Sequence, residues 1–261
     1  MSSKGSEYMG KVICIATQKG GVGKTSVTCN LGAALTLEGK SVLLIDLDAQ
    51  CSLTMSLGFN PEKFETSSVT TLDTPDKSPM CIYETGIEKL SLMPANPMLS
   101  TLEMSLYHKK ESNTRLKKAL EKVKEIFDYV LIDCSPSLSL TTINGLIASD
   151  YVLIPAETKI SSNYSLSTFI STVNTIKEVM NNDIEILGVI ATMYYCQAKE
   201  DKSVLEDLQD TFEILGVIRR TTAVSSAFSI GKPCVLTNKR SLATQEFKEI
   251  AKKIINKVEV E

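Results

Sequence analysis

The stretch of sequence that decides the fold is Gln18-Lys19-Gly20-Gly21-Val22-Gly23-Lys24-Thr25. An apolar, β-branched run at residues 11–17 precedes it and predicts a buried strand, and residues 26–37 have the apolar spacing of a helix. A strand, a glycine turn and a helix in this order are the setting of a phosphate-binding loop, or P-loop. The stretch matches that pattern except at its first position, where Gln18 replaces a glycine.

The residues of this loop have separate predicted tasks. The glycines let successive backbone N–H groups curl around a phosphate, and the helix N-terminus adds the positive end of its dipole. Lys24 is expected to reach the β and γ oxygens, and the Thr25 hydroxyl is expected to bind Mg²⁺. The loop does not need Lys19, so this second lysine must have a different task. The predicted nucleotide-binding residues here are Lys19, Gly20, Gly21, Val22, Gly23, Lys24, Thr25 and Ser26.

Strand-like apolar runs alternate with helix-like runs along the chain. This rhythm predicts an α/β fold with a doubly wound, mostly parallel sheet of about seven or eight strands flanked by helices. The expected strands are residues 12–16, 42–46, 90–94, 129–133, 151–155, 186–193 and 214–218. Residues 59–86 are proline-rich and irregular, and predict a loop with a short helix or strand. A helix with one apolar face is expected within residues 113–127.

Composition excludes several classes of protein. No apolar run approaches the ~20 residues that span a bilayer, and the first ten residues are too polar for a signal peptide, so a cytoplasmic location is expected. The seven cysteines contain no Cys-x-x-Cys pair and are interpreted as reduced core residues. The single histidine, His108, is expected at the surface.

Three carboxylates follow predicted strands. Asp46 and Asp48 end one strand region, and Asp133 ends another. Ligands of such sheets bind at the carboxyl ends of the strands, where the P-loop also lies. We therefore expect Asp133 to hold Mg²⁺ through water, and Asp46 to contact Mg²⁺ or the P-loop from a greater distance.

The lysine at the head of the loop makes this sequence resemble the deviant P-loop of the ParA/MinD family of ATPases. Residues 41–50 resemble the family's strand that ends in Asp-x-Asp-Pro-Gln, and residues 129–137 resemble its Asp-Cys-Pro-Pro-Ser segment. The match is nearest to the partition ATPases of the ParA/Soj type and runs from about Lys11 to the last helix. We expect a short tail at residues 1–10 and a single P-loop ATPase domain at 11–261, without the N-terminal helix-turn-helix domain of longer plasmid members.

This resemblance implies an ATPase that uses ATP and Mg²⁺ and has three catalytic residues, Lys19, Lys24 and Asp48. Lys24 corresponds to the P-loop lysine, and Lys19 to the lysine that reaches across the interface of an ATP-induced homodimer to the partner's nucleotide. Asp48 corresponds to the residue that orients the attacking water. The family's Pro-Arg-Asn segment near the base matches residues 219–221, so Arg219 and Thr221 are expected at the purine, with Thr221 in place of the asparagine.

Charge is distributed unevenly along the chain. The whole chain has a net charge of −3, but residues 217–258 hold nine basic and two acidic side chains, a net +7, which leaves −10 elsewhere. ParA/Soj-type relatives bind double-stranded DNA non-specifically through late basic residues, and a ParB-like centromere-binding protein stimulates their hydrolysis. A nucleoid-associated plasmid or chromosome partition protein is therefore expected. Its predicted DNA-binding residues are Arg219, Arg220, Lys232, Arg240, Lys248 and Lys252.

Two alternatives stay open. Phe247, Ile250, Ile254 and Val258 form an apolar stripe beside lysines, as in the interfacial helix of a MinD-like membrane ATPase. The acidic end of the chain argues against anionic lipid, and no stable membrane association is expected. A ParA-like protein could also position a cargo other than DNA.

Overall fold

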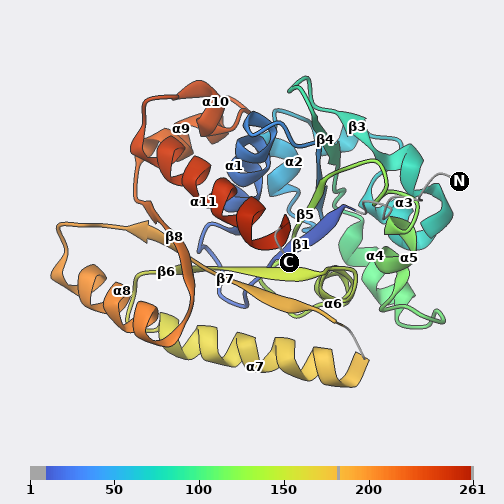
Figure 1. The fold of residues 1–261 in the computed structure, drawn as a ribbon. Coiled ribbons are helices and arrows are strands. Elements are labelled where there is room, and N and C mark those ends of the chain that lie inside the picture. Colours follow the sequence, from blue (N-terminus) through green and yellow to red (C-terminus); the bar gives the residue numbers. More distant parts are fainter. Residues whose placement is uncertain (1–9, 181–182, 260–261) are drawn as a thin grey trace, which may run out of the picture.

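The computed structural model describes residues 10–180 and 183–259, and these residues form an eight-stranded sheet in the order β3-β4-β2-β5-β1-β6-β7-β8 (Figure 1). Of the expected tail at residues 1–10, only Gly10 lies inside the described ranges. All neighbouring strands pair in parallel except β3, which is antiparallel to β4. The predicted fold class is confirmed.

All seven expected strands are present, with ends that shift by at most a few residues. The strands are β1 (Lys11–Ile15), β2 (Val42–Asp46), β3 (Tyr83–Glu84), β4 (Leu90–Met93), β5 (Tyr129–Asp133), β6 (Tyr151–Glu157), β7 (Glu185–Tyr194) and β8 (Ile214–Arg219). The additional strand β3 lies in the irregular stretch 59–86, which also contains the short 3₁₀ helices η1 (Pro61–Lys63) and η2 (Pro75–Cys81).

Helices cover both faces of the sheet, because alternate side chains of each buried strand point to opposite faces. One face packs against α1 (Lys24–Leu37), α2 (Ser52–Ser56), α9 (Thr222–Ser229), α10 (Cys234–Thr237) and α11 (Leu242–Glu259). The other packs against α3 (Ser68–Asp73), α4 (Leu99–Leu106), α5 (Arg115–Leu120), α6 (Leu140–Ile147), α7 (Ser162–Met180) and α8 (Lys199–Thr211). Figure 1 shows α7 and α8 below the sheet and α1 and α11 above it.

The last helix buries its apolar stripe. Phe247, Ile250, Ile254 and Val258 are each at most 1% exposed, and α11 packs on β8 and α1. The stripe is thus part of the protein core, and in this conformation it offers no apolar face to a lipid surface. Within residues 10–180 and 183–259, no helix has the length and apolarity that crossing a membrane requires.

Of three further local expectations, those for the cysteines and His108 agree with the structure more closely than that for the helix. The helix expected within residues 113–127 is regular only over α5, after which the chain continues in turns, although Leu116, Leu120 and Val123 are buried as expected. Six of the seven cysteines are buried thiols, and Cys196 is exposed. His108 is exposed, as expected.

Candidate functional site

The P-loop joins β1 to α1 at the carboxyl edge of the sheet. Gly21 and Gly23 have φ angles of 74° and 87°, a backbone conformation that side chains disfavour. No atom lies within 4 Å of the place where a Cβ on Gly21 would stand, so the loop is open on that side. Gly23 caps α1 without a side-chain hydrogen bond, and no acidic residue occupies the first turn. The first N–H groups of α1 therefore stay available to an anion.

Lys24 lies across this loop. It is only 7% exposed, and its Nζ donates to the carbonyl oxygen of Lys19 at 3.4 Å. Burial lowers the pKa of Lys24, while the nearby carboxyl of Asp133 acts in the opposite direction. A cation held in this position fits the phosphate-binding task that the sequence predicts for Lys24.

Asp133 is joined to the start of α1 by two hydroxyl groups. Thr25 donates to Oδ2 at 2.7 Å, and Thr28 donates to Oδ1 at 3.2 Å. Burial, together with the charge of Asp46, raises the pKa of Asp133 to about 8, although the Thr25 hydrogen bond and Lys24 oppose this shift. The Thr25 hydroxyl and the buried carboxyl group of Asp133 place oxygen donors side by side. Such a donor set suits Mg²⁺ beside phosphate oxygens.

Asp46 holds a different part of the site. It is fully buried, and it accepts hydrogen bonds from the N–H of Thr54 at 2.9 Å, from the Thr54 hydroxyl at 2.8 Å and from the N–H of Asp48 at 3.1 Å. Burial raises the pKa of Asp46 to about 6. These contacts orient the turn that carries Asp48. The expected contact of Asp46 with Mg²⁺ or the P-loop stays a prediction.

Asp48 lies in a tight turn after β2. Its Oδ1 accepts the N–H of Gln50 at 2.9 Å, and its carbonyl accepts the N–H of Cys51 at 2.8 Å. The side chain is half-buried, and its charge acts on the pKa of Lys24. Asp48 follows the end of β2, where Asp46 pairs in register with Asp133. Its role in orienting the attacking water stays a prediction.

Lys19 is bound within its own chain. Its Nζ forms an ion pair of 2.7 Å with Oε1 of Glu157 and donates to the Ser161 hydroxyl at 2.8 Å. Glu157 ends β6 and is 8% exposed. Glu157 was not predicted from the sequence, because a carboxylate at the end of this strand becomes a candidate site residue only when the fold brings Lys19 beside it.

A cavity of about 830 Å³ continues from the P-loop side of α1. Its wall contains Gly23 and Ser26 together with the purine-site candidates Arg219 and Thr221. Other residues of this wall were not predicted from the sequence, among them Met193, Val224, Ser225, Phe228 and Phe247. They come from β7, α9 and α11, and only the positive φ of Met193, which a sequence does not reveal, marks one of them as unusual.

Thr221 and Arg219 already have partners inside the chain. The Thr221 hydroxyl accepts the N–H of Ala223 at 3.2 Å and so caps α9. The backbone N–H of Arg219 donates to Oε2 of Glu246 at 3.0 Å, and the Arg219 Nε lies 3.3 Å from Oε1 of the same carboxylate.

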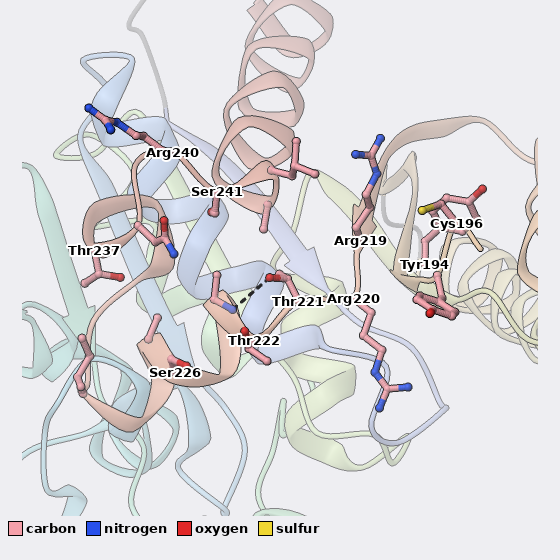
Figure 2. Close-up of a pocket in the computed structure, with 17 residues that line it drawn as sticks. Tyr194, Cys196, Arg219, Arg220, Thr221, Thr222, Ser226, Thr237, Arg240 and Ser241 are labelled. Carbon is pink, nitrogen blue, oxygen red and sulfur yellow. Dashed lines mark hydrogen bonds between the residues drawn. The ribbon is translucent and has the colours of Figure 1, made fainter. Parts of the chain in front are cut away.

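A second pocket, of about 730 Å³, adjoins the first and shares residues 219–221 with it. It brings together three of the predicted DNA-binding residues, and Figure 2 shows the side chains of Arg219, Arg220 and Arg240 spread around it. The other three predicted residues, Lys232, Lys248 and Lys252, lie outside its lining, and Lys252 is 3.9 Å from Glu38.

The comparisons with known proteins agree with this geometry. The model of an AAA domain family matches residues 10–186. The sporulation initiation inhibitor protein Soj of Bacillus subtilis is 38% identical, with 94% of this chain and 98% of Soj covered. The chromosome partitioning protein ParA of Myxococcus xanthus is 30% identical, with 97% and 91% covered.

Solved structures give the same picture. Cobyrinic acid a,c-diamide synthase from Mycobacterium smegmatis, with a bound ATP analogue and magnesium, is similar at a TM-score of 0.83 and 31% identity, with 96% of each chain covered. A plasmid partition protein from Borrelia burgdorferi bound to AMPPNP is similar at a TM-score of 0.81 and 26% identity, with 95% of this chain and 99% of that chain covered. With this sequence similarity over nearly the full length and the P-loop geometry described above, the chain belongs to the family of Soj and the chromosome partitioning protein ParA.

Proposed function

We propose that this protein is a Mg²⁺-dependent ATPase whose nucleotide state controls a partition cycle. The observation that supports the proposal is the 2.7 Å hydrogen bond from Thr25 to the buried Asp133, beside the buried Lys24 at the start of α1. The ATP analogue and magnesium bound to the similar synthase, and the AMPPNP bound to the similar partition protein, support ATP and Mg²⁺ as the ligands.

In this proposal each residue has a defined task. The N–H groups at the start of α1 and Lys24 would hold the β and γ phosphates, and Thr25 and Asp133 would hold Mg²⁺. Bound Mg²⁺ neutralises charge on the phosphate oxygens. Asp48, kept in place by its hydrogen bond to Asp46, would orient the attacking water. Gly20, Val22 and Ser26 complete the proposed nucleotide site, with Arg219 and Thr221 at the base.

Lys19 makes oligomerisation the proposed consequence of binding. Its ammonium group is directed to Glu157 and Ser161 rather than to the loop of its own chain. In an ATP-induced homodimer, Lys19 would leave these partners and neutralise phosphate charge in the other subunit. The nucleotide would thereby set the oligomeric state.

The dimer is proposed to bind double-stranded DNA non-specifically on the nucleoid through basic residues of the last third of the chain. A ParB-like centromere-binding protein would stimulate hydrolysis and release the dimer, which would move a plasmid or a chromosome. The similarity to Soj and ParA supports this reading over the synthase reaction, since Soj has the higher identity of the two. A ParA-like positioner of another cargo is the second candidate, and the buried stripe of α11 does not favour a membrane-bound one.

Lys19→Ala tests the proposal most directly. We expect the parent to become a dimer with a non-hydrolysable ATP analogue in multi-angle light scattering, and the variant to stay a monomer that still binds the analogue. An electrophoretic shift on non-specific DNA, with ATP against ADP over a salt series, tests the DNA part. Dimerisation of Lys19→Ala equal to that of the parent would contradict the proposed task of Lys19.

A further inference from the structure

The carboxylate of Glu157 forms ion pairs with two lysines, one at each oxygen atom. Lys19 Nζ lies 2.7 Å from Oε1, and Lys159 Nζ lies 3.0 Å from Oε2. The two lysines differ in environment, because the Lys19 side chain is 24% exposed and that of Lys159 is 66% exposed. The two lysines therefore contact different oxygen atoms of the carboxylate and do not compete for one of them.

The backbone around β6 keeps Lys159 beside this carboxylate. The N–H of Lys159 donates to the carbonyl of Glu157 at 2.9 Å, and the carbonyl of Lys159 accepts the N–H of Ser162 at the start of α7 at 2.8 Å. These two hydrogen bonds hold the backbone of Lys159 close to Glu157, and neither of them involves a residue of the P-loop.

The charge of Glu157 must be balanced because its side chain is only 10% exposed. Burial opposes its ionisation, but the hydrogen bonds from Lys19 and Lys159 hold the pKa of Glu157 below its ordinary value. A buried carboxylate that loses its only cation is strongly destabilised, whereas one that keeps a second cation is not. The cost of releasing Lys19 therefore depends on Lys159.

We infer that Lys159 is a positioning residue of the dimer switch, which keeps Glu157 neutralised when Lys19 leaves it for the partner subunit's nucleotide. This inference rests on the proposed ATP-induced dimer. Without Lys159, Lys19 becomes the sole counterion of Glu157 among the residues that the structure describes, and its exchange from one subunit to the other becomes more costly. Lys159 thus acts through Lys19 and does not itself touch the phosphates.

The test is a double-mutant cycle between Lys159→Met and Glu157→Gln, with dimerisation by a non-hydrolysable ATP analogue measured by analytical ultracentrifugation. We expect Lys159→Met to weaken dimerisation about tenfold or more, because the buried carboxylate then loses one of the two cations that pair with it among the described residues and the release of Lys19 becomes more costly. Glu157→Gln frees Lys19 and should dimerise at least as tightly as the parent. Adding Lys159→Met to Glu157→Gln should change little, since no charge remains to be balanced.

Two controls separate this role from others. Lys159→Arg should restore dimerisation, and Lys177→Met, which removes an exposed charge from α7, should leave it unchanged. Lys159 also lines the cavity beside the P-loop, so the affinity of the monomer for ADP must be measured as well. A loss of ADP affinity as large as the loss of dimerisation would place Lys159 on the nucleotide and overturn the inference.

The remaining outcomes are also decisive. If the parent does not dimerise with the analogue, the proposed function fails and this inference fails with it. If the parent dimerises and Lys159→Met dimerises equally well, the inference alone is wrong. A Lys159→Met effect that persists undiminished in the Glu157→Gln background would show that Lys159 does not act through Glu157.

Discussion

The hydroxyl of Thr25 donates a hydrogen bond of 2.7 Å to Oδ2 of Asp133, and this bond joins the start of α1 to the end of β5. Two residues more than a hundred positions apart thus form one donor set. The register of the sheet explains why these two residues meet. Ile15, the last residue of β1, pairs with Asp133 of β5, and the P-loop begins a few residues after Ile15. These two residues are the proposed ligands of Mg²⁺.

Thr25→Ala should weaken nucleotide binding only when Mg²⁺ is present. The hydroxyl is the proposed Mg²⁺ ligand, so we expect about a tenfold loss of ATP affinity with Mg²⁺ and little change in excess EDTA. Thr25→Ser keeps the hydroxyl and serves as the matched control. Titration calorimetry under both conditions makes the comparison. An equal loss with and without Mg²⁺ would mean that Thr25 acts through the loop's conformation instead.

Asp48→Ala should stop hydrolysis and preserve the ATP-bound dimer. A residue that orients the attacking water contributes about a hundredfold or more to the rate, whereas the phosphates are bound by other groups. The control is Gln50→Ala, since Gln50 contacts Asp48 only through its backbone N–H. Phosphate release measures hydrolysis, and light scattering measures the dimer. Normal turnover by Asp48→Ala would remove Asp48 from the catalytic set.

The sequence predicted the parts of the fold that depend on local pattern. Apolar runs located seven strands, and the P-loop stretch placed Lys24 and Thr25 because glycine spacing alone builds that loop. It did not reveal which charges would meet across the fold. Lys19 forms an ion pair with Glu157, and Arg219 forms one with Glu246. Both pairs exist only because the fold brings strands and helices together that are distant in the sequence. The cavity wall was missed for the same reason, because Met193 and Phe228 are ordinary apolar residues in the sequence.

Glu246→Gln should remove part of the dependence of stability on pH. Burial raises the pKa of Glu246, although Arg219 opposes the shift. A carboxyl whose pKa is raised by folding stabilises the protein most below its unfolded-state pKa, and this contribution is lost as pH rises through the folded-state value. We therefore expect the free energy of unfolding of the parent to fall relative to that of the variant as pH rises from acid toward neutral. Urea unfolding at several pH values measures this difference, and parallel curves for both proteins would contradict it.

Arg220→Glu combined with Arg240→Glu should abolish DNA binding and leave ATP-induced dimerisation in place. Both arginines are exposed at the pocket of Figure 2, and reversed charges there would repel the phosphate backbone. Lys177→Glu, on the helix α7 of the opposite face, changes the net charge and serves as a control. In a salt series, each lost phosphate contact should reduce the slope of log affinity against log salt by about one. Retention of the parent's salt slope would exclude these two residues from the DNA surface.

Thr221→Asn should increase discrimination between ATP and GTP. An asparagine amide can donate to and accept from adenine at once, and among the described residues that line the cavity beside the P-loop there is no asparagine or glutamine. The Thr221 hydroxyl is already used to cap α9, so the parent is expected to prefer ATP by less than about tenfold. Asparagine also caps helices well, and its amide oxygen can accept a second hydrogen bond, so the variant should keep α9 intact while its amide contacts the base. Thr221→Ser is the matched control, because it keeps the cap and adds no amide.

Competition of ATP and GTP against a fluorescent ADP derivative gives both affinities for each protein. A parent that prefers ATP by more than about a hundredfold would show that other groups of the cavity read the base.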